Sequence, residues 1–151
     1  MKGIGHAARL FRGVAGNLGH VPGFPIRDGS RREYTVTVLR IKKSERWSGK
    51  VGRVVRVGVI GAGRIGKIHI ENLCYRVPNV EVTAVADIAL EETRGWVKQF
   101  GITNVVADPM QIIEDETIDA VLICSPTDLH AEQIITTAKA GKDIFCEKPI
   151  A

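Results

Sequence analysis

A chain of 151 residues with 44% apolar and 25% charged residues has the size and composition of one soluble globular domain. Its longest apolar runs, such as IDAVLICSP, fall far short of the roughly 20 residues that cross a bilayer, which excludes an integral membrane protein. The three cysteines, Cys74, Cys124 and Cys146, lie far apart without a C-x-x-C pair, which argues against a disulfide framework and a metal site and favours a cytoplasmic location. Two of them, Cys124 and Cys146, lie in apolar runs, so we interpret these as small buried hydrophobes.

The basic residues are concentrated in the first third of the chain. Residues 1–53 carry twelve Lys or Arg against three acids, a balance of +9, whereas residues 54–151 carry nine against fourteen, a balance of −5. Beyond the stretch YTVTVLRI at 34–41, residues 1–53 lack periodicity, and we interpret them as a poorly ordered basic extension. Three explanations remain open: an arm for nucleic acid or anionic surfaces, a targeting peptide, or an over-long start before the domain. Without interleaved aromatic residues, the basic residues are weak evidence for nucleic-acid binding.

From residue 54 onward, short apolar runs alternate with helical stretches, which is typical of repeated βαβ units with a parallel sheet. The second helical stretch is expected to end at Gly101 and the fourth at Gly141, because glycine favours the C-cap conformation. Five strands joined by four right-handed crossovers predict an α/β fold, a doubly wound parallel sheet of the Rossmann type over residues 54–151. The predicted strands are 54–60, 80–87, 104–107, 118–125 and 142–147.

The stretch VGVIGAGRIGKIH holds a G-x-G-x-x-G pattern between the first predicted strand and the first predicted helix. Alone the pattern is weak, but this strand–helix context is the one that dinucleotide binding requires. Gly61 permits the tight turn, Gly63 lets the backbone approach a pyrophosphate, and Gly66 lets the helix pack closely. The N–H groups at the helix N-terminus would then face the phosphates. The predicted cofactor-binding residues of this loop are Gly61, Ala62, Gly63, Arg64, Ile65 and Gly66.

An acid follows at the end of the second predicted strand, where Asp87 lies 21 positions after Gly66. A carboxylate there accepts hydrogen bonds from the ribose hydroxyls of NAD, whereas a 2′-phosphate is repelled unless a base compensates. No base lies among the next three residues, which begin with Ile88. Arg94 is the one nearby base in the sequence that could compensate a 2′-phosphate. NAD is therefore predicted over NADP, with Asp87 and Ile88 as cofactor-binding residues. A second role for Asp87, capping the next helix, is compatible with the first.

The stretch ICSPTDLH at 123–130 leaves the fourth predicted strand beside the first strand, at the switch point where doubly wound sheets bind ligands. Thr127 suits the N-cap of the fourth helix and Pro126 stiffens the turn, so both could be purely structural. His130 is expected to look toward this edge, and we interpret it as structural more often than functional and not as a catalytic base. The candidate cofactor-binding residues here are Ser125, Pro126, Thr127 and His130.

The final stretch FCEKPIA places Glu147 and Lys148 directly after the fifth predicted strand, at the same edge. A lysine held beside a nicotinamide and a substrate alcohol can polarise or position the hydroxyl group. A charged pair after a strand is also common in solvated loops, and spacing alone leaves both interpretations open. Glu147 and Lys148 are included as candidate cofactor-binding residues.

Taken together, VGVIGAGRIGKIH, AVADI, IDAVLICSPTDLHAEQI and AGKDIFCEKPIA resemble the nucleotide-binding half of the Gfo/Idh/MocA oxidoreductases, and most closely the inositol 2-dehydrogenases among them. The resemblance covers about residues 54–151. It implies that Lys148 is catalytic and touches both the nicotinamide side of NAD and the substrate hydroxyl. It also implies that the Lys148–Pro149 bond is often cis and that residues 125–127 line the nicotinamide ribose. The implied reaction is hydride transfer to NAD from a secondary alcohol of a cyclitol or sugar such as myo-inositol, leaving a ketone.

In the family, a second and larger domain follows this half and carries most of the substrate pocket, the oligomer interface, and an Asp and a His of the catalytic set. None of it is in this sequence. We therefore expect the chain to bind NAD, to be inactive alone, and to form a homo-oligomer only together with that domain. The alternative is a non-catalytic NAD-binding or redox-sensing module with a basic arm. A methyltransferase is a weaker alternative, because it has no use for the EKP motif.

Overall fold

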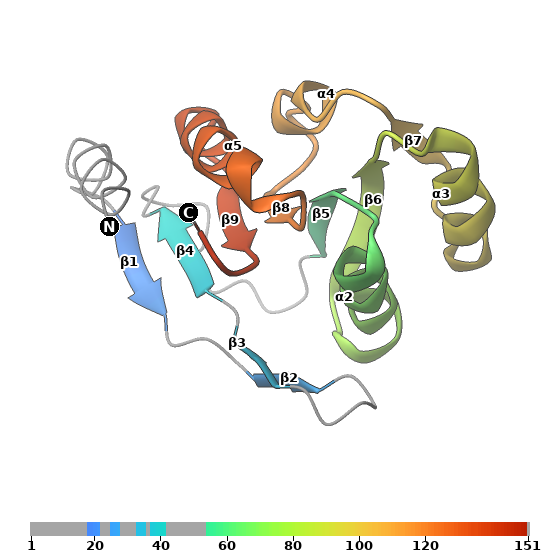
Figure 1. Cartoon of the computed structure of the whole chain (residues 1–151), viewed down its shortest axis with the longest axis horizontal. Helices are drawn as coiled ribbons and strands as arrows, with labels where there is room; N and C mark the ends of the chain where they lie inside the picture. The colour runs from blue at the N-terminus through green and yellow to red at the C-terminus, as the bar shows by residue number, and fades with distance from the viewer. Residues whose placement is uncertain (1–17, 22–24, 28–32, 36, 42–53, 151) are drawn as a thin grey trace.

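In a computed structural model, the described part of the chain comprises residues 18–21, 25–27, 33–35, 37–41 and 54–150 (Figure 1). The remainder of the predicted basic extension, residues 1–53, lies outside the described residues. No helix in the described part is long and apolar enough to cross a membrane.

The centre of the fold is a sheet of parallel strands in the spatial order β9-β8-β5-β6-β7. Because both faces of a parallel sheet are covered, its central strands are apolar along nearly their whole length, and the last four residues of β5 are all buried. The five strands and their order confirm the predicted doubly wound sheet. Their bounds are β5 Val55–Ile60, β6 Val80–Ala86, β7 Asn104–Val106, β8 Ala120–Ile123 and β9 Asp143–Cys146.

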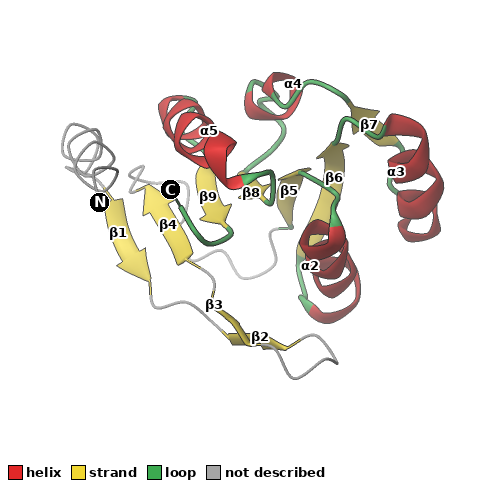
Figure 2. Ribbon diagram, in the orientation of Figure 1, coloured by secondary structure: helices red, strands yellow, loops and turns green. Residues whose placement is uncertain are grey.

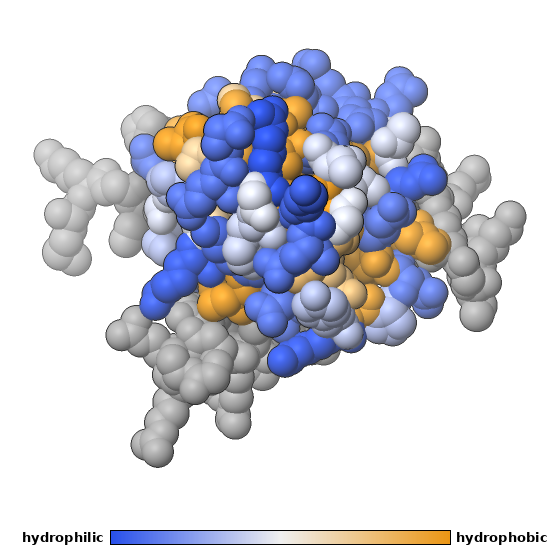
Figure 3. Space-filling model, turned by 90° about the vertical axis from the view of Figure 1, so that its right-hand side faces the viewer, coloured by the Kyte–Doolittle hydropathy of each residue, from blue (hydrophilic) through white to orange (hydrophobic). Residues whose placement is uncertain are grey.

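Helices cover both faces of this sheet and create two buried clusters (Figure 2). On one face Val59 of β5 belongs to the cluster of Ile70 and Val97, and on the other Ile60 belongs to the cluster of Ile134. The outer surface on the side of α2 and α3 is largely hydrophilic (Figure 3). The helices are α2 Arg64–Arg76, α3 Leu90–Val97, the 3-10 turn η2 Lys98–Phe100, α4 Met110–Ile113 and α5 Thr127–Lys139.

The ends of the helices confirm two predictions and correct one. Gly101 after η2 and Gly141 after α5 both have positive φ, 76° and 71°, as expected at helix C-termini. Thr127, by contrast, is not the N-cap of α5 but its first residue. Pro126 has extended backbone angles, φ −55° and ψ 145°, and so takes the N-cap position, where it offers no side-chain hydrogen bond.

Four short strands lie in the described stretches before residue 42, where the sequence indicated strand periodicity only over 34–41. The strand β4 pairs antiparallel with β1 on one side and with β9 on the other, which adds an antiparallel edge to the parallel sheet. Pairing with β4 satisfies the backbone edge of β9. The strands are β1 Leu18–Val21, β2 Pro25–Arg27, β3 Glu33–Thr35 and β4 Thr37–Ile41. Among the described residues, β2 pairs with β3 alone.

The turn after β5 fits against the turn after β8 because Gly61 has no side chain. Gly61 has φ +92°, and a Cβ built on it would lie 2.7 Å from the carbonyl atoms of Cys124 and 2.8 Å from the Ser125 nitrogen. Gly66 is equally constrained, because a Cβ there would collide with the Gly61 carbonyl oxygen. The predicted roles of both glycines, tight turn and close packing, are therefore confirmed, with Gly66 packing on the turn itself.

We predict that Gly61→Ala destabilises the fold by about 2–4 kcal/mol, the sum of the left-handed backbone penalty and of overpacking against backbone atoms. Urea denaturation with linear extrapolation measures this free energy. The matched control is Gly95→Ala in α3, where a Cβ meets nothing within 4 Å. That change should stabilise the chain by about 0.5–1 kcal/mol through helix propensity. Equal effects of the two substitutions would contradict the prediction.

Candidate dinucleotide-binding site

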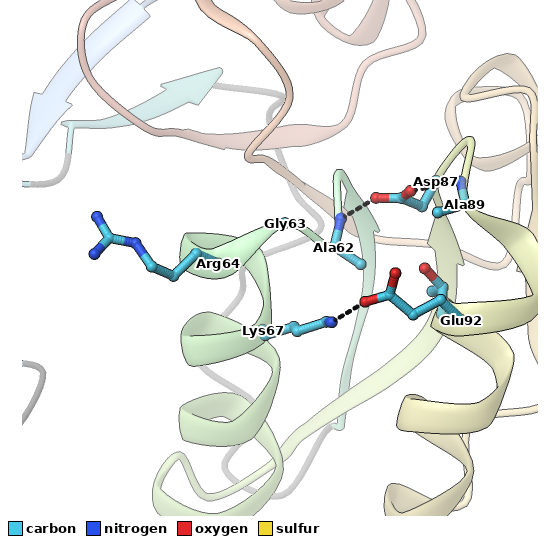
Figure 4. Close-up of a pocket in the computed structure, with 8 residues that line it drawn as sticks. Ala62, Gly63, Arg64, Lys67, Asp87, Ala89 and Glu92 are labelled. Carbon is cyan, nitrogen blue, oxygen red and sulfur yellow. Dashed lines mark hydrogen bonds and ion pairs between the residues drawn. The ribbon is translucent and has the colours of Figure 1, made fainter.

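A pocket of about 430 Å³ opens between the start of α2 and the start of α3, a size within the usual range of ligand pockets (Figure 4). Four of its lining residues were predicted from the sequence: Ala62, Gly63, Arg64 and Asp87. The other four were not: Lys67, Ala89, Glu92 and Thr93.

The N-terminus of α2 forms one wall of the pocket and has the properties of an anion site. Gly63 occupies the N-cap position, no described side chain caps this end, and the first turn holds no acid. A Cβ built on Gly63 would meet nothing within 4 Å, so the space in front of the helix is open. Unpaired N–H groups and the helix dipole favour a phosphate at such a position, so these residues fit the pyrophosphate of a dinucleotide.

Asp87 forms the opposite wall and also holds two loops together. Its Oδ2 accepts a hydrogen bond from the Ala62 N–H at 2.6 Å, and its Oδ1 accepts one from the Ala89 N–H at 2.8 Å (Figure 4). Asp87 is not the N-cap of α3, because Ala89 takes that position and its own side chain makes no capping hydrogen bond. The contact of Asp87 Oδ1 with the Ala89 N–H instead closes a turn before the helix. Each carboxylate oxygen has two lone pairs, so Asp87 retains acceptor capacity for ribose hydroxyls.

An ion pair that the sequence did not reveal joins α2 to α3 beside the pocket. Lys67 Nζ lies 2.7 Å from Glu92 Oε1 (Figure 4). It also lies 5.6 Å from the centre of the Trp96 ring. Arg94, the base that could have compensated the 2′-phosphate of NADP, pairs with Glu91 at 2.7 Å and does not line the pocket. Lys67, which lines the pocket together with Asp87, is thus paired with a second carboxylate.

Six of the other predicted site residues follow the carboxyl ends of β8 and β9, outside this pocket: Ser125, Pro126, Thr127, His130, Glu147 and Lys148. The remaining four, Gly61, Ile65, Gly66 and Ile88, belong to the glycine loop, to α2 and to the turn after β6, but they do not line the pocket. Lys148 is exposed, and its bond to Pro149 is cis, as the family resemblance implied. His130 is buried and faces this edge as predicted: its Nε2 lies 2.7 Å from the Ser125 carbonyl oxygen and its Nδ1 lies 2.9 Å from that of Pro149. Its contacts agree with a structural interpretation.

Two further predicted positions have distinct surroundings. Ile88 is 94% exposed beside Asp87 and thus presents an apolar side chain to solvent. Ser125 donates its hydroxyl hydrogen to Gln133 Oε1 at 2.6 Å. Within the described residues, no group of three or more His, Cys, Asp or Glu is placed to hold a metal ion.

A buried pair near Lys148 escaped the sequence analysis. His69 Nε2 of α2 lies 2.5 Å from Glu147 Oε1, and both side chains are at most 8% exposed. The only local signal was a histidine one turn after Gly66, on the buried side of the helix.

Burial and, secondarily, the Glu147 charge raise the pKa of the Cys146 thiol to about 12. Burial raises the pKa of Cys124 well above its usual value, with the charges of Glu147 and Cys146 adding to the effect.

The family model of an oxidoreductase family with an NAD-binding Rossmann fold, Gfo/Idh/MocA, matches residues 55–151. The chain belongs to the Gfo/Idh/MocA oxidoreductase family. The predicted resemblance is confirmed, and so is NAD as the cofactor type of the matched domain. Myo-inositol 2-dehydrogenase of Thermotoga maritima is 43% identical over 97 residues, 64% of this chain and 29% of that protein. The NAD⁺-dependent scyllo-inositol 2-dehydrogenase of Bacillus subtilis is 40% identical over 96 residues, 64% of this chain and 28% of that protein.

Solved structures of dehydrogenases share this fold. Myo-inositol dehydrogenase from Lactobacillus casei, in complex with NAD(H) and myo-inositol, matches with a TM-score of 0.61 at 37% identity, over 65% of this chain and 29% of that one. A probable dehydrogenase from Thermotoga maritima matches with a TM-score of 0.61 at 43% identity, over 64% and 29%. The chain therefore spans less than a third of the length of these relatives.

We predict that Cys124 and Cys146 resist thiol reagents in the folded chain, because a raised pKa leaves almost no thiolate at about pH 8. Cys74 is only half-buried and should react first, although burial raises its pKa as well. Titration with a chromogenic disulfide should find one accessible thiol in the native chain and three after unfolding in guanidinium. Rapid modification of all three thiols in the native chain would contradict the burial of Cys124 and Cys146 near Glu147.

Proposed function

We propose that residues 54–150 bind NAD(H) in the pocket between α2 and α3. The observation that carries this proposal is the arrangement of Asp87 opposite the open, uncapped N-terminus of α2. One wall suits a pyrophosphate and the other suits the diol of a ribose, and the Asp87–Ala62 hydrogen bond fixes their separation. Family membership supports the same assignment.

In this proposal the loop 61–66 holds the pyrophosphate through backbone N–H groups, and Asp87 accepts hydrogen bonds from the adenosine ribose. Ile88, exposed beside it, offers an apolar surface to the adenine ring. The Asp87 carboxylate lines the pocket and disfavours a 2′-phosphate, and the lining base Lys67 is paired with Glu92, which supports NAD over NADP. Residues 125–127, at the next strand end, are proposed to line the nicotinamide ribose.

We further propose that the reaction of the whole enzyme oxidises a secondary alcohol of a cyclitol or sugar such as myo-inositol. The support is the similarity to inositol dehydrogenases and the EKP turn, which presents an exposed Lys148 at the carboxyl edge of the sheet. Bound NAD⁺ supplies the hydride acceptor. Lys148 is the residue proposed to contact the substrate hydroxyl and orient it toward the nicotinamide.

We predict that Asp87→Asn weakens NADH binding by about tenfold or more, because a charged acceptor for the ribose is lost. NADPH should lose less affinity than NADH, because the repulsion of its 2′-phosphate is relieved. Titration of the intrinsic fluorescence of both cofactors measures the two dissociation constants. Glu81→Gln is the matched control, since Glu81 is exposed near the start of β6 and Asp87 follows the other end of that strand. Equal losses of NADH affinity in Asp87→Asn and Glu81→Gln would contradict the assignment of Asp87 to the ribose.

We predict that this 151-residue chain forms no NADH from NAD⁺ and myo-inositol, even where it binds NADH. The matched region is 28–29% of the length of the inositol dehydrogenases, and substrate contacts are proposed to come mainly from outside it. Absorbance of NADH, followed with and without myo-inositol, measures the rate. Inositol-dependent NADH formation would overturn this prediction and would also exclude the alternative of a non-catalytic NAD-binding module.

A further inference from the structure

Two buried histidines hold the short segment that presents Lys148. His69 comes from α2, which contacts β5 and β6, and His130 comes from α5, which contacts β8 and β9. The two histidines are 3% and 2% exposed. One contacts the residue before Lys148 and the other contacts the residue after it. Lys148 itself is exposed, so its side chain is the accessible part of a segment fixed on both sides.

The contact on the first side passes through the carboxylate of Glu147. Its Oε1 lies 2.5 Å from His69 Nε2, and its Oε2 accepts a hydrogen bond from the backbone N–H of Lys148 at 3.1 Å. The Glu147 N–H donates to the Ile123 carbonyl at 3.0 Å, and the His69 ring packs edge-on against Phe145 at 5.4 Å. One carboxylate thus connects a helix side chain to the peptide of Lys148.

The contact on the second side is made by both nitrogens of His130. Each faces a backbone carbonyl oxygen, one of Ser125 and one of Pro149, and carbonyl oxygens only accept hydrogen bonds. The neutral ring can donate to one of these two oxygens, whereas the imidazolium can donate to both. In either state His130 places the turn after β9 against the turn after β8, which is the turn that abuts Gly61.

We propose that His69 and His130 are positioning residues that fix the backbone of Lys148 relative to the glycine loop. His69 lies on α2, the helix whose N-terminus faces the dinucleotide pocket. The same helix therefore places the pyrophosphate site and, through Glu147, the backbone of Lys148, and so fixes the distance between them. This inference rests on the proposed function, in which Lys148 lies beside the nicotinamide. It assigns no proton transfer to either histidine.

The test compares two ligands, NADH and ADP-ribose, which lacks the nicotinamide. Dissociation constants are measured by calorimetry for the 151-residue chain and its variants. Lys148→Ala and His69→Leu should each weaken NADH binding by about fivefold to tenfold while leaving ADP-ribose within about twofold. The double variant should lose no more than the larger single loss, because His69 acts through Lys148.

Conservative variants make the test independent of folding defects. His69→Gln keeps an N–H donor near Nε2 and should retain NADH affinity within about twofold of the native chain. His130→Asn keeps a donor near Nδ1, toward Pro149, whereas His130→Gln keeps one near Nε2, toward Ser125. We expect His130→Asn to retain NADH affinity and His130→Gln to lose it.

Four results would overturn the inference. A parallel loss of NADH and ADP-ribose in His69→Leu would show a merely structural role, as would additive losses in the double variant. Equal behaviour of His130→Asn and His130→Gln would exclude the contact to Pro149 as the relevant one. A native chain that binds neither ligand would instead reject the proposed NAD(H) site itself, and the inference with it.

Discussion

The close meeting of two turns at Gly61 is the constraint on which the site depends. The two central strands β5 and β8 end side by side, and the Cys124 N–H donates to the Ile60 carbonyl at 2.7 Å directly below the contact. Because no side chain fits between the turns, the chain can leave β5 in a left-handed step and enter α2 at once. The helix N-terminus is therefore directed at the carboxyl edge of the sheet, where a ligand can approach it.

The other candidate residues lie at the same edge of the sheet, because the residue that follows each of these strands is hydrogen-bonded to a neighbouring strand. Parallel strands have all their carboxyl ends on one side, and helices packed on both faces keep that side rigid. Asp87, Ser125 and Lys148, far apart in sequence, follow three of these exits. The backbone bonds at this edge run from Gly61 N–H to the Ala86 carbonyl, Asp87 to Val106, Cys124 to Ile60 and Glu147 to Ile123, at 2.7–3.0 Å.

Local sequence signals were sufficient for the sheet, the glycine loop and the acid after β6, because each depends on residues close together in the chain. Contacts between distant segments left no such signal. Lys67 has the spacing of a water-facing helix residue, and its partner Glu92 is 25 positions away. His69 and Glu147 are 78 positions apart, and only the packing of α2 near the end of β9 joins them. The pairing of β4 with β9 is long-range in the same sense, because the sequence indicated both strands but held no local signal that they pair.

The burial of Glu147 is better explained by geometry than by stability. Removing a carboxylate and an imidazole from water is unfavourable, and well-packed apolar residues commonly replace such pairs with no loss of stability. Burial first, and the Glu147 charge second, raise the pKa of the neighbouring thiols Cys146 and Cys124. The carboxylate therefore lies in apolar surroundings that do little to solvate it. An apolar pair would fill the same space but could not accept the N–H of Lys148. The polar pair adds directional hydrogen bonds, which link α2, the helix after the glycine loop, to the backbone of the exposed Lys148.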